Sequence, residues 1–269
     1  TINTLAYSYD GVNWVGLGKT IFSNQSISVA WNGSRWVAVG VGTNTIAYSN
    51  DGINWIGLGT SIFSIVGFGI AWGNNIWVAV GRGTNTIATS PDGINWTGIG
   101  SSIFTTSGRG ITWNGSRFIA GGAGTNTLAY SSNGSDWTPV ASSTSIFSTQ
   151  GRGFAWNSGI GNTYIQQPTL ALGTGTNTIS YSPDGISWSG LGTAIFTTQA
   201  NNAAWNGSIW VAVGQGTNTI AYSKDGTNWI GLGTTTFSTS GNAVSWNGEI
   251  WVAVGSGTNS TAYSTNGIT

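Results

Sequence analysis

Short runs of β-branched and aromatic residues alternate along the chain with clusters of Gly, Asn, Ser and Thr. Between residues 69 and 107, one run ends at Trp72, two more cover 76–80 and 86–90, and a fourth starts near Asn95. Such runs, bounded by turn residues, predict β-strands. The second run of a unit, such as 36–39, is apolar at every position, which is typical of a strand buried between neighbouring sheets. The pattern therefore predicts units of four short antiparallel strands.

The unit repeats, because one serine returns in the same context at a spacing of 41 residues, with a single spacing of 51. Its copies are Ser8, Ser49, Ser90, Ser131, Ser182, Ser223 and Ser264. Four strands in about 41 residues fit one blade of a β-propeller. We therefore expect an all-β fold: a six-bladed β-propeller of four-stranded antiparallel blades. It would form a single domain, residues 1–269, with a ten-residue insertion in the fourth blade.

The two ends of the chain complicate this blade count. Residues 1–14 and 258–269 both copy the second half of the unit, so there are six copies of the first strand pair and nearly seven of the second. In a closed six-bladed ring the N-terminal strands would complete the last blade, and a leftover strand would be an edge that can pair with a neighbouring molecule. A seven-bladed or open propeller is the alternative. A β-solenoid is a rival architecture, although its coils are usually shorter.

Two kinds of turn separate the strands. Asn-Gly pairs, such as Asn32-Gly33 and Asn114-Gly115, lie between the first and second strands, where they predict type I′ hairpins with two residues of positive φ. Asp-Gly pairs, such as Asp51-Gly52, lie between the third and fourth strands, where the Gly accepts a left-handed conformation.

The composition limits the chemistry. Only 5% of the residues are charged, and seven basic residues balance seven acidic ones, so no long-range field attracts a polyanion. There is no His and no Cys, which removes the commonest general base and the sulfur ligands of metals. No segment approaches the roughly 20 apolar residues of a membrane span. We therefore expect no cofactor, no metal site, no nucleic-acid partner and no membrane insertion.

The turn between the third and fourth strands carries the motif Ser-x-Asp-Gly-x-x-Trp. Its five copies begin with Ser8, Ser49, Ser90, Ser182 and Ser223. The motif resembles the Asp box of sialidase-like propellers, in a form one residue shorter between Asp and Gly, with Asn133 and Asn266 replacing Asp in two further copies. The resemblance implies a propeller fold in which the Asp carboxylate accepts backbone N–H bonds and the Trp packs beneath the turn.

The same resemblance implies no sialidase activity. That chemistry requires an arginine triad, a Tyr nucleophile paired with Glu, and a separate acid–base Asp. The only Glu, Glu249, lies in a hairpin, the Asp residues of the motif belong to turns, and Asp136 is next to one. Without His, Cys or a free carboxylate pair, acid–base, nucleophilic and metal-assisted mechanisms lack parts. We predict no catalytic residues and a chain that is not an enzyme.

Two sets of positions are candidates for ligand binding on the face where the second-to-third and fourth-to-first connections lie. The first is the amide of a repeated Gly-Thr-Asn-Thr loop, which either stabilises the turn itself or forms a ring of sugar-binding groups. These residues are Asn44, Asn85, Asn126, Asn177 and Asn218.

The second set changes in nearly every copy of an otherwise regular unit, near the start of the first strand. It consists of Ile27, Phe68, Arg109, Arg152, Asn201 and Asn242. Another variable position, after the second strand, holds Arg82, so Arg82, Arg109 and Arg152 come from consecutive blades and predict a basic arc for a carboxylate or sulfate. Neutral variation of exposed loops is the simpler interpretation.

Two functions fit this sequence. The first is an extracellular recognition module, lectin-like and multivalent, in which repetition gives avidity for a glycan. The alternative is a structural, self-associating component of a cell-surface layer, fibre or virion, joined through its terminal strands. The insertion, Asn157 to Pro168, is either a tolerated loop or an oligomer contact.

Overall fold

The computed structural model describes residues 2–10, 13–156 and 168–269. The regular elements of the described residues are all β-strands, apart from one short helix, α1 (Ser143–Ile146). No helix among them is long and apolar enough to cross a membrane. The all-β prediction is therefore confirmed.

The chain forms two compact halves. The first half is made of Thr1–Thr125 with Ser131–Thr138, and the second half of Asn126–Tyr130 with Pro139–Thr269. The prediction of a single domain over residues 1–269 stays a prediction.

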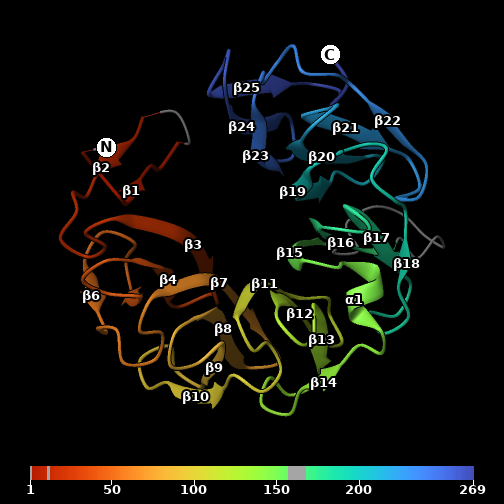
Figure 1. Ribbon diagram of the computed structural model, residues 1–269. Helices are drawn as coiled ribbons and strands as arrows, with labels where there is room; N and C mark the ends of the chain where they lie inside the picture. Colours follow the sequence, from red (N-terminus) through yellow and green to blue (C-terminus); the bar gives the residue numbers. More distant parts are fainter. Residues whose placement is uncertain (1, 11–12, 157–167) are drawn as a thin grey trace. The chain divides into compact units, whose positions relative to one another are not determined.

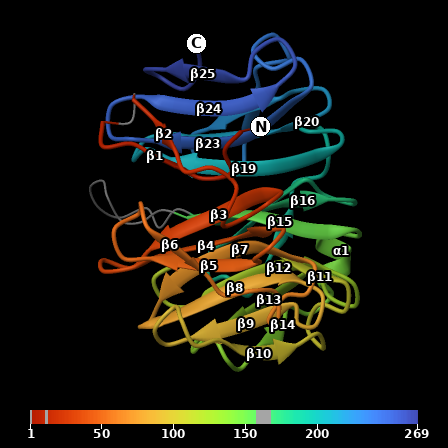
Figure 2. The same ribbon diagram turned by 90° about the vertical axis from the view of Figure 1, so that its left-hand side faces the viewer.

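The strands pair in chain order, as expected of consecutive antiparallel hairpins (Figure 1). A two-stranded hairpin comes first, followed by two four-stranded sheets. Their strands are β1 (Ala6–Tyr7) and β2 (Val15–Gly16); β3 (Gln25–Trp31), β4 (Trp36–Val41), β5 (Ile46–Ser49) and β6 (Trp55–Gly57); β7 (Val66–Gly73), β8 (Ile76–Arg82), β9 (Ile87–Ser90) and β10 (Thr97–Gly100). Figure 2 shows β7 to β10 following one another in that order.

Three more four-stranded sheets and one three-stranded sheet follow. Their strands are β11 (Ser107–Trp113), β12 (Phe118–Ala123), β13 (Leu128–Ser131) and β14 (Thr138–Pro139); β15 (Gln150–Ala155), β16 (Thr169–Thr174), β17 (Ile179–Ser182) and β18 (Ser189–Gly190); β19 (Gln199–Trp205), β20 (Trp210–Gln215), β21 (Ile220–Ser223) and β22 (Trp229–Gly231); β23 (Ser240–Trp246), β24 (Trp251–Ser256) and β25 (Thr261–Ser264). In the described residues, β1 and β2 thus pair with each other, and the last sheet has three strands.

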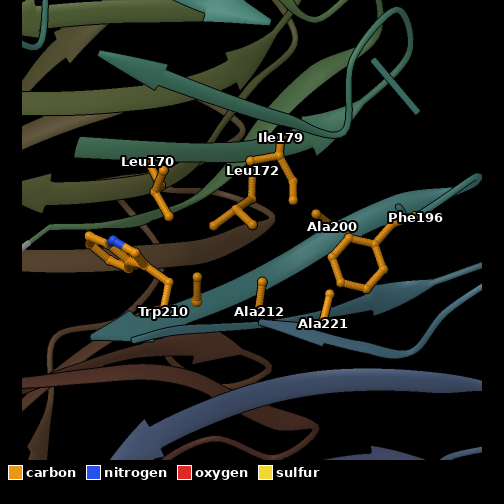
Figure 3. Packing of buried hydrophobic residues seen from close by; sticks show 10 residues of the cluster. Leu170, Leu172, Ile179, Phe196, Ala200, Trp210, Ala212 and Ala221 are labelled. Carbon is orange, nitrogen blue, oxygen red and sulfur yellow. The ribbon is translucent and has the colours of Figure 1, made fainter. Parts of the chain in front are cut away.

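The core lies between neighbouring sheets. Leu170, Leu172 and Ile179 of one sheet meet Trp210 and Ala212 of the next, together with Phe196 from the connection between them (Figure 3). Leu170, Leu172 and Trp210 are fully buried. This packing explains why a second strand such as β20 is apolar on both faces: Trp210 and Ala212 belong to this core, and Val211 and Val213 belong to the next one. In β24, of the last sheet, Val254 is 42% exposed.

The predicted type I′ turns are wrong for the Asn-Gly pairs. Gly33 has a φ of 99°, but Asn32 is not among the described residues with positive φ. Instead, the Asn32 side-chain oxygen accepts the backbone N–H groups of Ser34 and Arg35, at 2.9 and 2.7 Å, in a four-residue loop. Two consecutive positive φ values occur at Asn74 (46°) and Asn75 (58°), in a turn without an Asn-Gly pair.

The first part of the insertion lies after Trp137, and this segment of the chain contains α1, one helical turn. The corresponding segments of the other repeats are bends. Pro168 lies directly before β16. The remainder of the predicted insertion loop, residues 157–167, lies outside the described residues.

Candidate binding site

The six variable positions of the first strand share one backbone feature. In every sheet from β3 onward, the pairing between first and second strand shifts register at this residue, which is left out of the ladder as a β-bulge. A bulge re-aims the side chain of the extra residue and is found next to functional sites. We call these positions the bulge residues: Ile27, Phe68, Arg109, Arg152, Asn201 and Asn242.

Glycines before several bulges let the preceding sheet approach closely. A Cβ added to Gly108 would lie 2.5 Å from the Thr86 carbonyl oxygen and 2.8 Å from Cβ of Val80. The adjacent backbone is therefore fixed by packing, while the bulge residue itself varies.

In the first half of the chain, bulge residues of two neighbouring sheets contact each other. The Arg109 guanidinium carbon lies 4.1 Å from the centre of the Phe68 ring, which is a cation–π arrangement. Both side chains are half-buried, and Ile27 on the preceding sheet is 37% exposed. Phe68 and Arg109 thus combine an aromatic ring with a positive charge.

In the second half of the chain, two bulge residues form polar contacts. The Asn201 amide nitrogen donates to the Gly241 carbonyl oxygen at 2.8 Å, and its oxygen accepts from Nε2 of Gln199 at 2.8 Å. The Asn242 oxygen accepts from the Ser240 hydroxyl at 2.9 Å, and Asn242 is exposed. Asn201 is thus held in place by its neighbours, whereas Asn242 is exposed to solvent.

Arg152 is the charged bulge residue of the second half of the chain. It is half-buried, and burial lowers the pKa of its guanidinium. Among the described residues, its Nε has no hydrogen-bond partner, and neither does the buried Thr174 Oγ1 on the adjacent strand β16. A guanidinium stays charged in proteins, so this cation lies where an anionic ligand would compensate its desolvation.

The predicted basic arc is only partly described. Arg82 is exposed at the end of β8, where it lies opposite Val66. Arg82 and Arg109 belong to the first half of the chain, and Arg152 belongs to the second half. The arc as a single site therefore stays a prediction.

The repeated Asn loops have a structural role that the sequence did not reveal. The Asn85 nitrogen donates to the Ile62 carbonyl oxygen at 2.8 Å, and its oxygen accepts from the Gly100 N–H at 3.0 Å, so one amide joins the connection before its sheet to the end of the fourth strand, β10. Asn44, Asn177 and Asn218 make the same pair of bonds. These four amides bond other loops rather than their own backbone, which corrects the turn interpretation, and their oxygens are already acceptors. Asn126 occupies the same loop position.

A glycine of the fourth strand accompanies the amides of Asn44, Asn85, Asn177 and Asn218. A Cβ at Gly98 would lie 2.2 Å from the Asn85 side-chain oxygen. The fourth strand thus needs Gly at this position to admit the Asn side chain.

The Ser-Asp turns hold their carboxylates in hydrogen bonds. Asp51 Oδ1 accepts from the N–H groups of Ile53 and Asn54, at 2.8 and 2.7 Å, and Oδ2 accepts from the Asn54 side chain. Bonds from the Asn54 side chain, and then from the two backbone N–H groups, lower the pKa of Asp51 below its ordinary value. The Trp55 indole nitrogen donates to the Gly52 carbonyl oxygen at 3.0 Å.

Asp184 shows the same balance. Burial alone would raise the pKa of Asp184, but bonds from the Ser187 and Ile186 N–H groups, with the hydroxyls of Ser182 and Ser187, lower it to about 2. Such carboxylates are anions committed to the turn. Among the described residues, no group of acidic side chains is placed to hold a metal ion.

No family model and no curated protein matches this chain. Among solved structures, it is similar to virginiamycin B lyase from Staphylococcus aureus, at a TM-score of 0.75 and 12% identity over 94% of this chain and 84% of the lyase. It is also similar to YCF48 bound to D1 peptide, at a TM-score of 0.64 and 15% identity over 90% of this chain and 79% of that one.

A third similar structure is the GH74 enzyme of Niastella koreensis, at a TM-score of 0.65 and 17% identity over 91% of this chain. The chain spans 36% of the length of that enzyme. Two of these three structures are enzymes, which contradicts the prediction, made from the residue types of the chain, that it is not an enzyme. The four-stranded sheets and these similarities together show that the chain has a β-propeller-like repeat fold.

Proposed function

We propose that this chain is a recognition module that binds acidic glycans through its bulge residues. The observation that carries the proposal is the position of these residues: the unit keeps its strands, turns and loop amides but changes the chemistry of the bulge residue, running Ile, Phe, Arg, Arg, Asn, Asn. A repeat that keeps its packing but varies the side chains that its bulges redirect is typical of a ligand-binding surface.

The chemistry of the bulge residues supports an acidic sugar. A guanidinium forms bidentate pairs with a carboxylate or sulfate. Arg152 is half-buried, and its Nε has no hydrogen-bond partner among the described residues. Phe68 offers an aromatic face beside Arg109. Asn242 adds an exposed amide of the kind that bonds sugar hydroxyls.

Binding of this kind would take place at a cell or virion surface. We further propose that the sheets are the blades of a six-bladed propeller and that the Ser-Asp turns are Asp boxes. Six first strands, from β3 to β23, support the blade count. The carboxylate-to-backbone bonds and the indole-to-carbonyl bond support the Asp-box assignment.

A glycan array probed with the intact chain tests the function. We expect carboxylated or sulfated glycans to be retained over neutral ones, and Arg152→Ala and Arg109→Ala each to weaken retention about tenfold or more, since charge-assisted hydrogen bonds are lost. Lys224→Ala is the matched control, because it removes an exposed positive charge in the turn between β21 and β22. Equal retention of all glycans, or unchanged binding by both arginine variants, contradicts the proposal.

A further inference from the structure

The chain contains six Asn-Gly pairs, which occupy two different kinds of turn. Four of them lie in the hairpins between the first and second strands of a sheet, and two lie in the turns that follow the third strand. The hairpin pairs begin with Asn32, Asn114, Asn206 and Asn247, and the other two begin with Asn133 and Asn266. In an Asn-Gly pair the backbone nitrogen can approach the preceding side-chain amide closely, because glycine has no Cβ.

In the four hairpins, the glycine nitrogen is accessible. Gly33 is exposed, and within the described part of the chain its N–H donates no hydrogen bond. The same holds for Gly115, Gly207 and Gly248. A Cβ added to Gly33 or Gly248 would have no other atom within 4 Å, so solvent reaches the backbone at these positions.

The side-chain carbonyl of each hairpin Asn is polarised by hydrogen bonds. Oδ1 of Asn32 accepts the backbone N–H groups of Ser34 and Arg35, at 2.9 and 2.7 Å, and the Ser34 hydroxyl at 3.1 Å. The other three hairpin Asn residues accept the two corresponding N–H groups. Attack on the side-chain carbonyl carbon moves negative charge onto this oxygen, where donors that are already in place stabilise it, as in an oxyanion hole.

In the turns of the second kind, the glycine nitrogen is buried and bonded. The Gly134 N–H donates to Oγ of Ser131 at 2.8 Å, and the Gly267 N–H donates to Oγ of Ser264 at 2.8 Å. Both glycines are buried. The oxygen of Asn133 also accepts two backbone N–H groups, at 2.9 and 2.8 Å. The two kinds of turn therefore differ in the glycine nitrogen rather than in the side-chain carbonyl.

We propose that the four hairpin Asn residues are deamidation sites of the folded chain, which react by attack of the following glycine nitrogen, whereas the serine bond protects the two other pairs. The glycine nitrogen loses its proton to hydroxide and bonds to Cγ of Asn. The Cγ–Nδ2 bond then breaks, and the leaving nitrogen takes a proton from water and departs as ammonia. Water opens the resulting succinimide at either carbonyl, which gives Asp or isoaspartate without any oxidation or reduction.

The Asp product fits the hairpin. Oδ1 of Asp51 accepts the N–H groups of the second and third residues after it, which is the arrangement that Asn32 has in its hairpin. Conversion to Asp therefore preserves the loop, whereas isoaspartate lengthens the backbone by one methylene and disrupts it. Reaction at all four sites would add four carboxylates to a chain whose seven basic and seven acidic residues balance.

Peptide mapping by mass spectrometry, after incubation of the intact folded chain at mildly alkaline pH, tests the proposal. We expect each hairpin Asn to gain one mass unit about tenfold or more faster than Asn133 and Asn266, the factor to which one buried hydrogen bond corresponds. The reacted peptides are expected to contain both Asp and isoaspartate. Equal rates at all six pairs, or Asp as the only product, as direct hydrolysis would give, overturns the proposal.

The same measurement on the chain unfolded in urea separates the fold from the sequence. The six rates are expected to converge there, because the carbonyl and the glycine nitrogen lose their partners in the folded chain. A difference between the two kinds of pair that persists in urea would come from neighbouring residues alone and overturns the role of the turns.

Ser131→Ala tests the protection directly. It removes the acceptor of the Gly134 N–H, so reaction at Asn133 is expected to rise about tenfold or more while Asn266 stays protected. Ser135→Ala is the matched control, because it removes an exposed hydroxyl from the same turn and leaves the Gly134 bond in place. An unchanged rate at Asn133 in Ser131→Ala, or an equal rise in both variants, overturns the protective role of the serine.

Discussion

At the scale of single residues, side chains that repeat in sequence proved to be structural, and side chains that vary proved to be aimed by bulges. The Asn85 amide joins two loops through bonds to Ile62 and Gly100, so its repetition reflects folding. The sequence showed the repetition but not the partners, because they lie 23 and 15 residues away. The variation at the bulge positions was visible in the sequence, but the one-residue register shift that accompanies it was not predicted.

Replacement of the loop amide is the first prediction at this scale. Asn85→Ala is expected to lower the free energy of unfolding by about 1–3 kcal/mol, because the Ile62 carbonyl and the Gly100 N–H lose their partner. Urea titration measures the change, with Thr84→Ala as the control on an exposed neighbour.

The same site predicts a coupling. Gly98→Ala alone forces a Cβ against the Asn85 amide, whereas in the Asn85→Ala background the space is open. The double variant is therefore expected to be more stable than the sum of the single effects. Strict additivity in a double-mutant cycle would show that Gly98 is required for another reason.

Acid sensitivity is a further prediction for single residues. Asp184 has a folded-state pKa of about 2, below its ordinary value of 3.8. Its contribution to stability is therefore fully present above about pH 4 and is lost as the pH falls toward 2. Asp184→Asn keeps the oxygen acceptor, as Asn133 does in its own turn, and removes the titration. Thermal melting at pH 7 and pH 3 is expected to show a smaller difference for this variant, and an equal difference would exclude Asp184 as a source of acid sensitivity.

At the scale of elements, four strands in each unit were predictable because apolar runs and turn residues alternate so regularly. The run predicted at 76–80 appears as Ile76–Arg82, and the one at 86–90 as Ile87–Ser90. The hairpin type was not predictable from the Asn-Gly pair, because Asn32 adopts the alternative of capping two backbone N–H groups with its side chain. Helix α1 was also missed, since a four-residue segment carries no periodicity to detect.

The two hairpin types predict opposite responses to glycine. Asn75→Gly relieves a left-handed residue with a φ of 58° and is expected to be neutral or to stabilise by up to about 1 kcal/mol. Asn32→Gly removes the acceptor of the Ser34 and Arg35 N–H groups and is expected to destabilise by about 0.5–2 kcal/mol. Chemical denaturation of both variants measures the contrast, and the same sign for both would contradict the assignment of two turn types.

At the scale of the whole molecule, the proposed binding of an acidic glycan would couple stability to ligand concentration, because a ligand that binds the folded state stabilises it by mass action. A carboxylated or sulfated glycan that the array retains is therefore expected to raise the melting temperature of the native chain, and to raise that of Arg152→Ala less. Differential scanning calorimetry over a hundredfold range of glycan concentration measures both. An equal rise for the two chains would mean that Arg152 does not contribute to binding, which contradicts the proposed role of its guanidinium.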